Sequence, residues 1–102
     1  MNVETAMTGQ DLLVKAAGRI DSETAPRFEE QLAPRLAEAR SVVIDAAGVE
    51  YLSSAGVRAV LRAALKMTAQ KGTLKLRGVR REVAKVLALA GLEELIEGGG
   101  TA

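Results

Sequence analysis

Residues 41–57 read SVVIDAAGVEYLSSAGV and contain, in order, a β-branched run, a connection with a glycine, and the start of a helix. Residues 41–45 have the composition of a strand that is buried on both faces. Residues 46–51 are expected to form an irregular connection, and the helical spacing of apolar residues begins at Ser54. A buried strand that leads into a helix is typical of α/β folds, so this stretch predicts the fold class.

The residues before this stretch predict a β-hairpin. Residues 3–7 alternate weakly between apolar and polar side chains, and residues 12–16 form a clearer strand pattern. Residues 8–11, Thr-Gly-Gln-Asp, have the chemistry of a turn. We therefore expect two antiparallel strands, with residues 18–21 leading out of the second one.

A helix is predicted after the hairpin. Asp21 or Ser22 can cap its first turn, where Pro26 is acceptable. Pro34 lacks a backbone donor, so we expect a kink or an early end there and a loosened segment over residues 35–40. The apolar stripe of this helix has three- and four-residue spacing and consists of Ala25, Phe28, Leu32, Leu36 and Ala39.

Two more helices and one more strand are predicted after Ser54. The second helix is expected to end at Lys71 and Gly72, residues 73–77 alternate as a strand, and a third helix is expected to end at Gly91. Residues 92–96 form a last short element whose type the sequence leaves open. The predicted inner face of the second helix consists of Val57, Val60, Leu61, Ala64, Leu65 and Thr68.

The predicted element order is β-β-α-β-α-β-α. This order predicts a mixed, mostly parallel sheet of four to five strands that begins with a β-hairpin, with right-handed crossovers and helices packed on it. The length of 102 residues suits a single domain. We assign residues 1–97 to this α/β domain and expect residues 98–102 to be a flexible tail.

The composition excludes several kinds of site. The chain has no cysteine and no histidine, which excludes disulfides, thiol nucleophiles and ordinary zinc sites. No apolar run approaches the ~20 residues of a membrane span and no signal peptide is recognisable, so we expect a cytoplasmic protein. The net charge of +1 gives no reason to expect direct binding to nucleic acid. A basic cluster, interpreted as a solvated loop in preference to a polyanion site, consists of Lys75, Arg77, Arg80 and Arg81.

An enzyme is not expected, and neither is a cofactor or a metal site. A nucleophilic Ser53 or Ser54 would have no histidine as its base, and Lys66 and Lys71 lie more than ~10 Å along the helix. No glycine loop of the phosphate-binding type precedes a helix. The carboxylates available for acid–base chemistry, with no sign that two of them share a pocket, are Asp21, Glu23, Asp45 and Glu50.

The residues that remain for function are those of the loop Leu52-Ser53-Ser54-Ala55-Gly56. Ser53 or Ser54 stands where the N-cap of the second helix is expected. One interpretation is structural: serine is a good N-cap, and Gly56 permits close packing of helix on sheet. The other is that the hydroxyl accepts a phosphate, because helix N-termini stabilise anions. The added charge would then change which protein docks there while the fold stays intact.

Several segments resemble the STAS domain of the anti-sigma factor antagonist family. Residues 18–25 (GRIDSETA) resemble its Gly-x-hydrophobic-Asp-x-x-x-Ala segment, and residues 42–45 and 49–57 resemble its strand, loop and switch helix. Residues 72–76 (GTLKL) and 86–92 (VLALAGL) resemble the strand and closing helix that follow. They occur in the family's order and cover nearly the whole chain.

The resemblance implies a bacterial regulator of transcription that switches partners. Such domains bind a GHKL-type serine-kinase anti-sigma factor when unphosphorylated, and so free its sigma factor. The kinase phosphorylates a serine at the start of the second helix, and a serine phosphatase resets the switch. Aligned on Gly56, the phosphoacceptor falls on Ser54, with Ser53 as second choice. Ser53 stands where the family usually has Asp, Ala55 stands at its second hydroxyl position, and the family's Asp near the end of the second strand maps to Asp21.

The resemblance also implies which residues contact the partner, namely Asp21, Glu50, Ser53, Ser54, Ala55, Gly56, Val57 and Arg58. For Asp21 a helix-capping role is equally open, and ordinary surface charge explains Glu50 and Arg58 as well. An alternative function is a constitutive accessory subunit, like the STAS component of lipid-transport ATPase complexes, in which the same face docks without a phosphate cycle. A small-molecule or nucleotide sensor is less favoured because the loop lacks aromatic stacking residues. The oligomeric state stays open.

Overall fold

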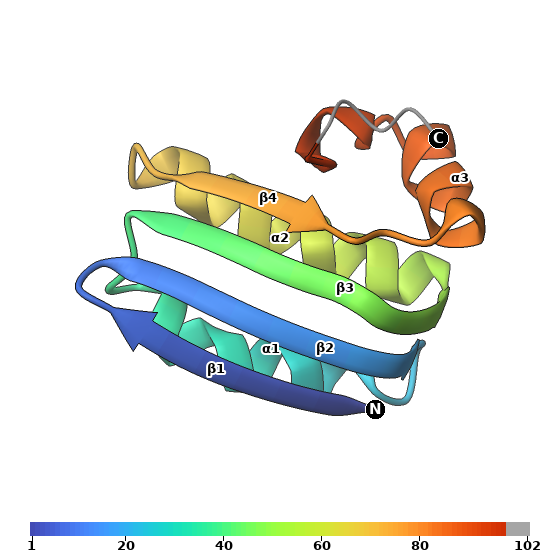
Figure 1. The fold of residues 1–102 in the computed structure, drawn as a ribbon, viewed down its shortest axis with the longest axis horizontal. Coiled ribbons are helices and arrows are strands. Elements are labelled where there is room, and N and C mark those ends of the chain that lie inside the picture. The colour runs from blue at the N-terminus through green and yellow to red at the C-terminus, as the bar shows by residue number, and fades with distance from the viewer. Residues whose placement is uncertain (98–102) are drawn as a thin grey trace.

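The computed structural model describes residues 1–97 and contains one mixed four-stranded sheet of order β1-β2-β3-β4 (Figure 1). The strands are β1 (Asn2–Thr8), β2 (Asp11–Ile20), β3 (Ser41–Leu52) and β4 (Thr73–Arg77). β1 and β2 are antiparallel, whereas β2 with β3 and β3 with β4 are parallel. The predicted α/β fold, with its hairpin and mostly parallel sheet, is confirmed. The predicted tail, residues 98–102, lies outside the described residues.

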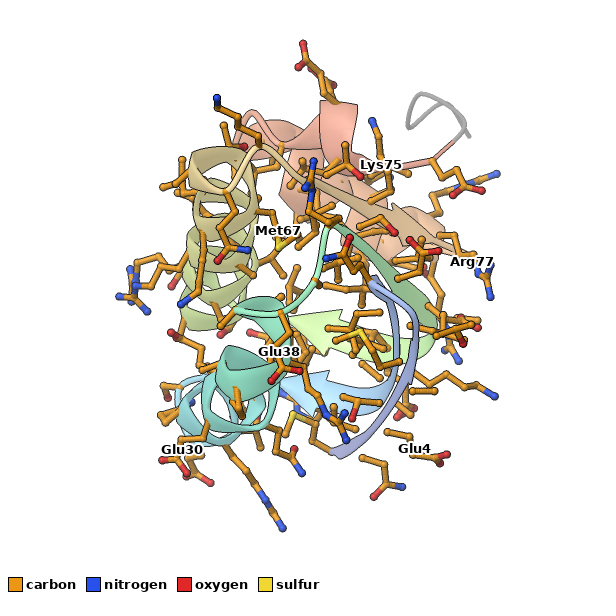
Figure 2. All side chains as sticks on the ribbon, turned by 90° about the vertical axis from the view of Figure 1, so that its left-hand side faces the viewer. Glu4, Glu30, Glu38, Met67, Lys75 and Arg77 are labelled. Atoms are coloured by element: carbon orange, nitrogen blue, oxygen red, sulfur yellow. The ribbon has the colours of Figure 1, made fainter. Side chains whose placement is uncertain are left out.

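Helices cover one face of this sheet. They are α1 (Ala25–Leu36), α2 (Ser54–Ala69) and α3 (Arg81–Leu89), followed by a short 3-10 helix, η1 (Glu93–Leu95). Figure 2 shows α1 and α2 side by side on one side of the strands, with Met67 pointing between α2 and the sheet. Within residues 1–97, no helix has the length and apolar character that crossing a membrane requires.

The core between helices and sheet is almost entirely aliphatic. Each fully buried Leu, Ile, Val or Phe contributes roughly 1.5–3 kcal/mol by leaving water. Phe28, on α1, is the one aromatic side chain in this layer. The largest fully buried side chains are Phe28, Leu12, Leu32, Ile44, Met67, Leu87, Val14, Val42 and Val60.

β3 is longer than the sequence predicts. Residues 46–51 are expected to be irregular, but the strand continues through them to Leu52. Its extra length pairs with β2, which is itself long, and β3 has one more residue than β2 at each of two register shifts, opposite Lys15–Ala17 and opposite Gly18–Arg19. The interpretation of residues 46–51 as a connection was wrong because their partner strand, not their own composition, holds them extended.

α1 also differs from its prediction in detail. The helix continues past Pro34 and ends at Leu36, and residues 37–40 are irregular as expected. Pro34 is exposed and lies in the last turn, where the lost backbone bond affects little of the helix. The N-cap is Thr24, not Asp21 or Ser22.

The buried face of α2 is rotated from the predicted one. Val60 is buried as expected, but Leu61 and Leu65 are 37% and 59% exposed. Ala59 and Ala63 take the inner face instead. Small side chains there let α2 approach α1 and the sheet closely, so the larger leucines are left outside.

The face of the sheet opposite α1 and α2 carries a row of alternating charges. The register places Glu4 beside Lys15, Lys15 beside Asp45, and Asp45 beside Arg77. Arg77 Nη2 lies 4.0 Å from Asp45 Oδ2. Figure 2 shows Glu4 and Arg77 directed away from the helices. Opposite charges on neighbouring strands contribute roughly 0.2–1 kcal/mol each and favour this register.

The basic cluster makes contacts within the domain. Lys75 Nζ donates to the carbonyl of Glu94 (2.8 Å), and Arg80 Nε donates to the carbonyl of Ala47 (3.0 Å). Together with the Arg77–Asp45 pair, these bonds engage three of the four basic side chains, and they link β4 to η1 and to β3, and the loop after β4 to β3. The contacts favour a structural role over a polyanion site.

Candidate functional site

The candidate site lies where β2 and β3 end and α2 begins. The two strands are parallel, so their last residues, Ile20 and Leu52, lie side by side. The amide of Ser53 donates to the carbonyl of Ile20 (2.9 Å). This bond joins the start of α2 to the end of β2, and so brings the loop after β2 beside the two serines. Carboxyl ends of parallel strands are the usual place for sites in such sheets.

The two serines have different roles at the start of α2. Ser53 is the N-cap, with extended backbone (φ −82°, ψ 176°), and its Oγ accepts a hydrogen bond from the amide of Gly56 (3.3 Å). Ser54 is the first residue of the helix, and it is exposed. Capping thus falls to Ser53, and the hydroxyl of Ser54 remains accessible for modification or contact.

Gly56 is required by close packing. It is buried, and a Cβ there would lie 2.6 Å from the carbonyl oxygen of Ile20 and 2.6 Å from Leu52 Cδ1. Real Cβ atoms do not approach that closely, so any side chain would push the helix start away from β2. The glycine therefore determines how closely residues 52–56, which we call the serine loop, pack against the sheet.

Asp21 shapes the turn that precedes α1. Its Oδ1 accepts bonds from the amides of Glu23 (3.0 Å) and Thr24 (3.1 Å) and from the Thr24 hydroxyl (3.2 Å). The Thr24 amide bond is the main cause that lowers the pKa of Asp21 below its ordinary value of 3.8. Its other oxygen lies 3.9 Å from Arg19 Nε. Asp21 is thus charged at neutral pH and follows directly on Ile20, the residue that binds Ser53.

Two residues near the site escape prediction from the sequence. Arg19 and Tyr51 pair in register at the ends of β2 and β3, and the Arg19 guanidinium carbon lies 4.1 Å from the centre of the Tyr51 ring. Tyr51 is 42% exposed. The contact between these two residues follows from the pairing of the ends of β2 and β3. That pairing could not be predicted from the sequence, because residues 46–51 are interpreted there as an irregular connection. Exposed Tyr and Arg are residues that often dominate protein interfaces.

The remaining predicted contact residues spread over β3 and α2. Glu50 and Arg58 are exposed, and Ala55 and Val57 are half-buried. One face of α2 continues from Ser54, because residues spaced by three and four lie in line on a helix. We call this face, formed by Ser54, Arg58, Leu61 and Leu65, the α2 outer stripe; all four of its residues are exposed.

The local electrostatics suit an anion at Ser54. The first-turn amides of a helix lack intrahelical acceptors, and they carry the positive end of the helix dipole. The first turn of α2 contains no acidic residue. Within residues 1–97, no hydrogen bond links either serine hydroxyl to a base, and no group of acidic side chains is arranged to hold a metal ion. What the geometry provides is an exposed hydroxyl, that of Ser54, at the N-terminus of a helix.

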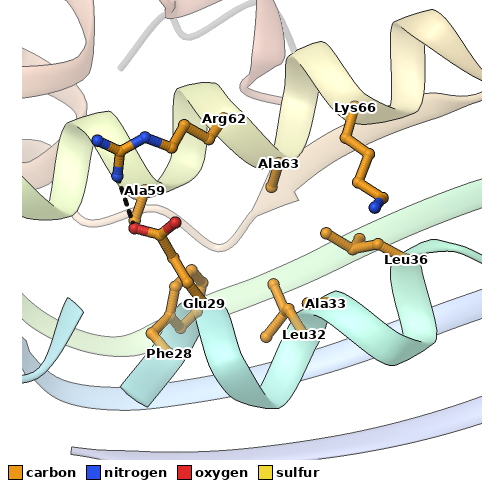
Figure 3. Close-up of a pocket in the computed structure, with 9 residues that line it drawn as sticks. All are labelled: Phe28, Glu29, Leu32, Ala33, Leu36, Ala59, Arg62, Ala63 and Lys66. Carbon is orange, nitrogen blue, oxygen red and sulfur yellow. Dashed lines mark hydrogen bonds and ion pairs between the residues drawn. The ribbon is translucent and has the colours of Figure 1, made fainter. Parts of the chain in front are cut away.

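A small groove lies between α1 and α2 (Figure 3), and no residue of the loop 52–56 lines it. Its volume is about 130 Å³, whereas sites for small organic ligands usually have roughly 300–1,000 Å³. Arg62 Nη1 donates to Glu29 Oε1 (2.8 Å) at its rim, which links α2 to α1 through one exposed ion pair. The groove is lined by Phe28, Glu29, Leu32, Ala33, Leu36, Ala59, Arg62, Ala63 and Lys66. It offers little to a small-molecule sensor.

Solved structures share this fold. The anti-sigma factor antagonist SpoIIAA in its unphosphorylated form is 17% identical, with a TM-score of 0.84, over 93% of this chain and 85% of that one. The phosphorylated Bacillus cell fate determinant SpoIIAA is 16% identical, with a TM-score of 0.77, over 93% and 88%. An anti-sigma factor antagonist from Mycobacterium paratuberculosis is 23% identical, with a TM-score of 0.81, over 94% and 82%.

Sequence comparison gives the family. No curated protein matches this chain. The family model described as "Mlab, STAS domain" matches residues 3–97, which include the serine loop, all four strands except the first residue of β1, and all the helices. The chain therefore belongs to the STAS-domain family.

Proposed function

We propose that this protein is an anti-sigma factor antagonist. When unphosphorylated, it binds a serine-kinase anti-sigma factor through residues 52–56 and the α2 outer stripe. Phosphorylation of Ser54 releases it. The observation that carries the proposal is the division of roles between the serines: Ser53 caps α2, and Ser54 is exposed on its first turn.

The position of Ser54 explains why a phosphate would act on binding and not on folding. A phosphoserine carries about −1.5 to −2 charges at neutral pH. A negative charge in the first turn of a helix is favourable by roughly 0.3–1 kcal/mol. The fold therefore accommodates the modification, while the docking surface around Arg58 and Leu61 acquires a strong negative charge. A partner that is complementary to the neutral hydroxyl would lose affinity.

The proposed partners follow from a cycle of phosphorylation and dephosphorylation at Ser54. They are a GHKL-type kinase, which adds the phosphate, and a serine phosphatase, which removes it, in a bacterial cytoplasm. Asp21, Glu50 and Tyr51 border the loop and contribute to recognition, with no catalysis by this chain. The existence of SpoIIAA structures in unphosphorylated and phosphorylated forms supports a phosphate cycle on this fold.

Mapping the phosphate tests the proposal. The protein is incubated with ATP and the GHKL-type anti-sigma kinase encoded in its own genome, and the modified residue is identified by mass spectrometry. We expect one phosphate on Ser54, absent from Ser54→Ala and retained in Ser53→Ala, which is the matched control because it removes the neighbouring hydroxyl. Undiminished labelling of Ser54→Ala would refute the assignment.

A constitutive accessory subunit of a lipid-transport ATPase is the second candidate. The observation that favours it is the loop itself, which has Ser53 in place of the family's usual Asp beside the phosphoacceptor position. In that case the same surface docks without a phosphate. Protein purified from its source separates the two: a transport ATPase as partner and an unmodified Ser54 favour the subunit, whereas a kinase partner favours the antagonist.

A further inference from the structure

The two edge strands of the sheet, β1 and β4, differ in how far other segments cover them. The outer edge of β4 is covered by the C-terminal segment, where Ile96 bridges to Leu76 and the amide of Glu97 donates to the carbonyl of Leu76 (2.7 Å). No residue of β1 is buried, and the strand contains no proline and no bulge. Glu4 is its one charged side chain. Natural proteins usually blunt such an edge, because it pairs readily with other strands.

The hydrogen-bonding phase of β1 follows from the hairpin. Thr8 pairs with Asp11 across the turn of Gly9 and Gln10, with Gly9 at φ +63°, so these two residues form a hydrogen-bonded pair. The register continues without a shift to Asn2 and Ala17, and bonded and non-bonded pairs alternate along an antiparallel ladder. The backbone groups that point away from β2 are therefore those of Val3, Thr5 and Met7.

The outward backbone groups of Val3, Thr5 and Met7 can pair with the same groups of a second copy, related by a two-fold axis at Thr5. An antiparallel second copy centred there sets Thr5 opposite Thr5 of the second copy and Val3 opposite Met7 of the second copy, and each such pair exchanges two backbone hydrogen bonds. On the open face, Glu4 then lies opposite Ala6 of the second copy. A register centred on Glu4 would instead bring two carboxylates together and turn the wrong backbone groups toward each other.

We propose that β1 is a homodimerisation edge, which pairs with β1 of a second copy in the register centred on Thr5 and forms one continuous sheet. The paired length is about 24 Å at ~3.4 Å per residue. Strand pairing of that length covers less than the ~1,200 Å² of a standard stable interface, so the dimer is weak and depends on concentration. β1 lies at the opposite edge of the sheet from β4 (Figure 1), and the dimer leaves the serine loop of each copy free for a partner.

Opposite charges at Ala6 test the register. Ala6 is exposed on the open face, so Ala6→Lys and Ala6→Glu both keep the fold. In the proposed dimer each new side chain faces Glu4 of the second copy, twice per dimer. Sedimentation equilibrium is expected to give a dimer dissociation constant at least about fivefold lower for Ala6→Lys than for Ala6→Glu, with wild type between them. Equal constants for the two variants, or a shift in the opposite order, would overturn the proposal.

A proline at Thr5 tests the edge itself. The Thr5 amide points away from β2, so Thr5→Pro removes an intermolecular donor and no bond within the hairpin. We expect Thr5→Pro to be a monomer with near wild-type circular dichroism, whereas Thr5→Ala, the matched control, still dimerises. A wild-type chain that stays monomeric at about 1 mM, or a Thr5→Pro variant that associates like wild type, contradicts the inference.

Discussion

Gly56→Ala is the substitution whose effect the structure specifies most sharply. Within a helix, alanine is normally more stable than glycine by about 1 kcal/mol, so propensity alone predicts stabilisation. The new Cβ would lie 2.6 Å from the carbonyl oxygen of Ile20 and 3.1 Å from Ile20 Cγ2. The first of these is a backbone atom, which cannot rotate away. Overpacking of this kind costs about 1–3 kcal/mol, with the upper half expected against a backbone.

The expected net effect of Gly56→Ala is therefore a destabilisation of about 1–2 kcal/mol, after the gain in helix propensity is subtracted. For a domain of this size, thermal unfolding followed by circular dichroism should show a Tm lower by roughly 4–15 °C. Because the strain acts at the serine loop, affinity for the partner should fall as well. A Tm equal to or above that of wild type would show that α2 does not lie as close to β2 as described.

Substitutions at three further positions test other contacts. Ser53→Ala removes the N-cap and should cost about 1 kcal/mol in urea unfolding, whereas Ser53→Asp, which still caps, should stay near wild type; equal losses in both would contradict the capping role. Asp21→Asn tests the pH dependence: the folded pKa lies below the ordinary 3.8, so the stabilisation is present above that value and is lost as pH falls through the folded pKa. In Asp21→Asn, the free energy of unfolding should no longer show this decrease at low pH. A dependence of the free energy of unfolding on pH that equals that of wild type would contradict the lowered pKa of Asp21. Arg62→Ala breaks an exposed ion pair with Glu29 and should cost less than about 1 kcal/mol; a much larger loss would mean that the pair organises the two helices.

Local signals account for what could be predicted from the sequence. The turn at residues 8–11 and the alternation on both sides of it are sufficient for the hairpin. The β-branched run at residues 42–44 is sufficient for a buried strand, and the serine pair is sufficient for the start of α2. The candidate loop was found in the same way, because an N-cap residue is recognised by its side chain and its position before an apolar period.

Features that depend on contacts with a segment distant in the sequence could not be predicted. The length of β3 depends on pairing with β2, so the Arg19–Tyr51 contact is not visible in either segment alone. The rotation of α2 depends on how closely α1 approaches. Leucine is buried more often than alanine, but the narrow space between α2, α1 and the sheet accommodates Ala63, and Leu61 is left exposed. The roles of Ser53 and Ser54 likewise required the backbone geometry of the cap.

The central claim is that charge at Ser54 controls docking on the α2 surface. Isothermal titration of the anti-sigma kinase with wild type, Ser54→Asp and Ser54→Asn tests it directly, since Asn matches Asp in shape but carries no charge. We predict affinity close to wild type for Ser54→Asn and at least about tenfold weaker binding for Ser54→Asp, equivalent to about 1.4 kcal/mol. Circular dichroism should be the same for all three. Equal affinity for Ser54→Asp and Ser54→Asn would contradict the account.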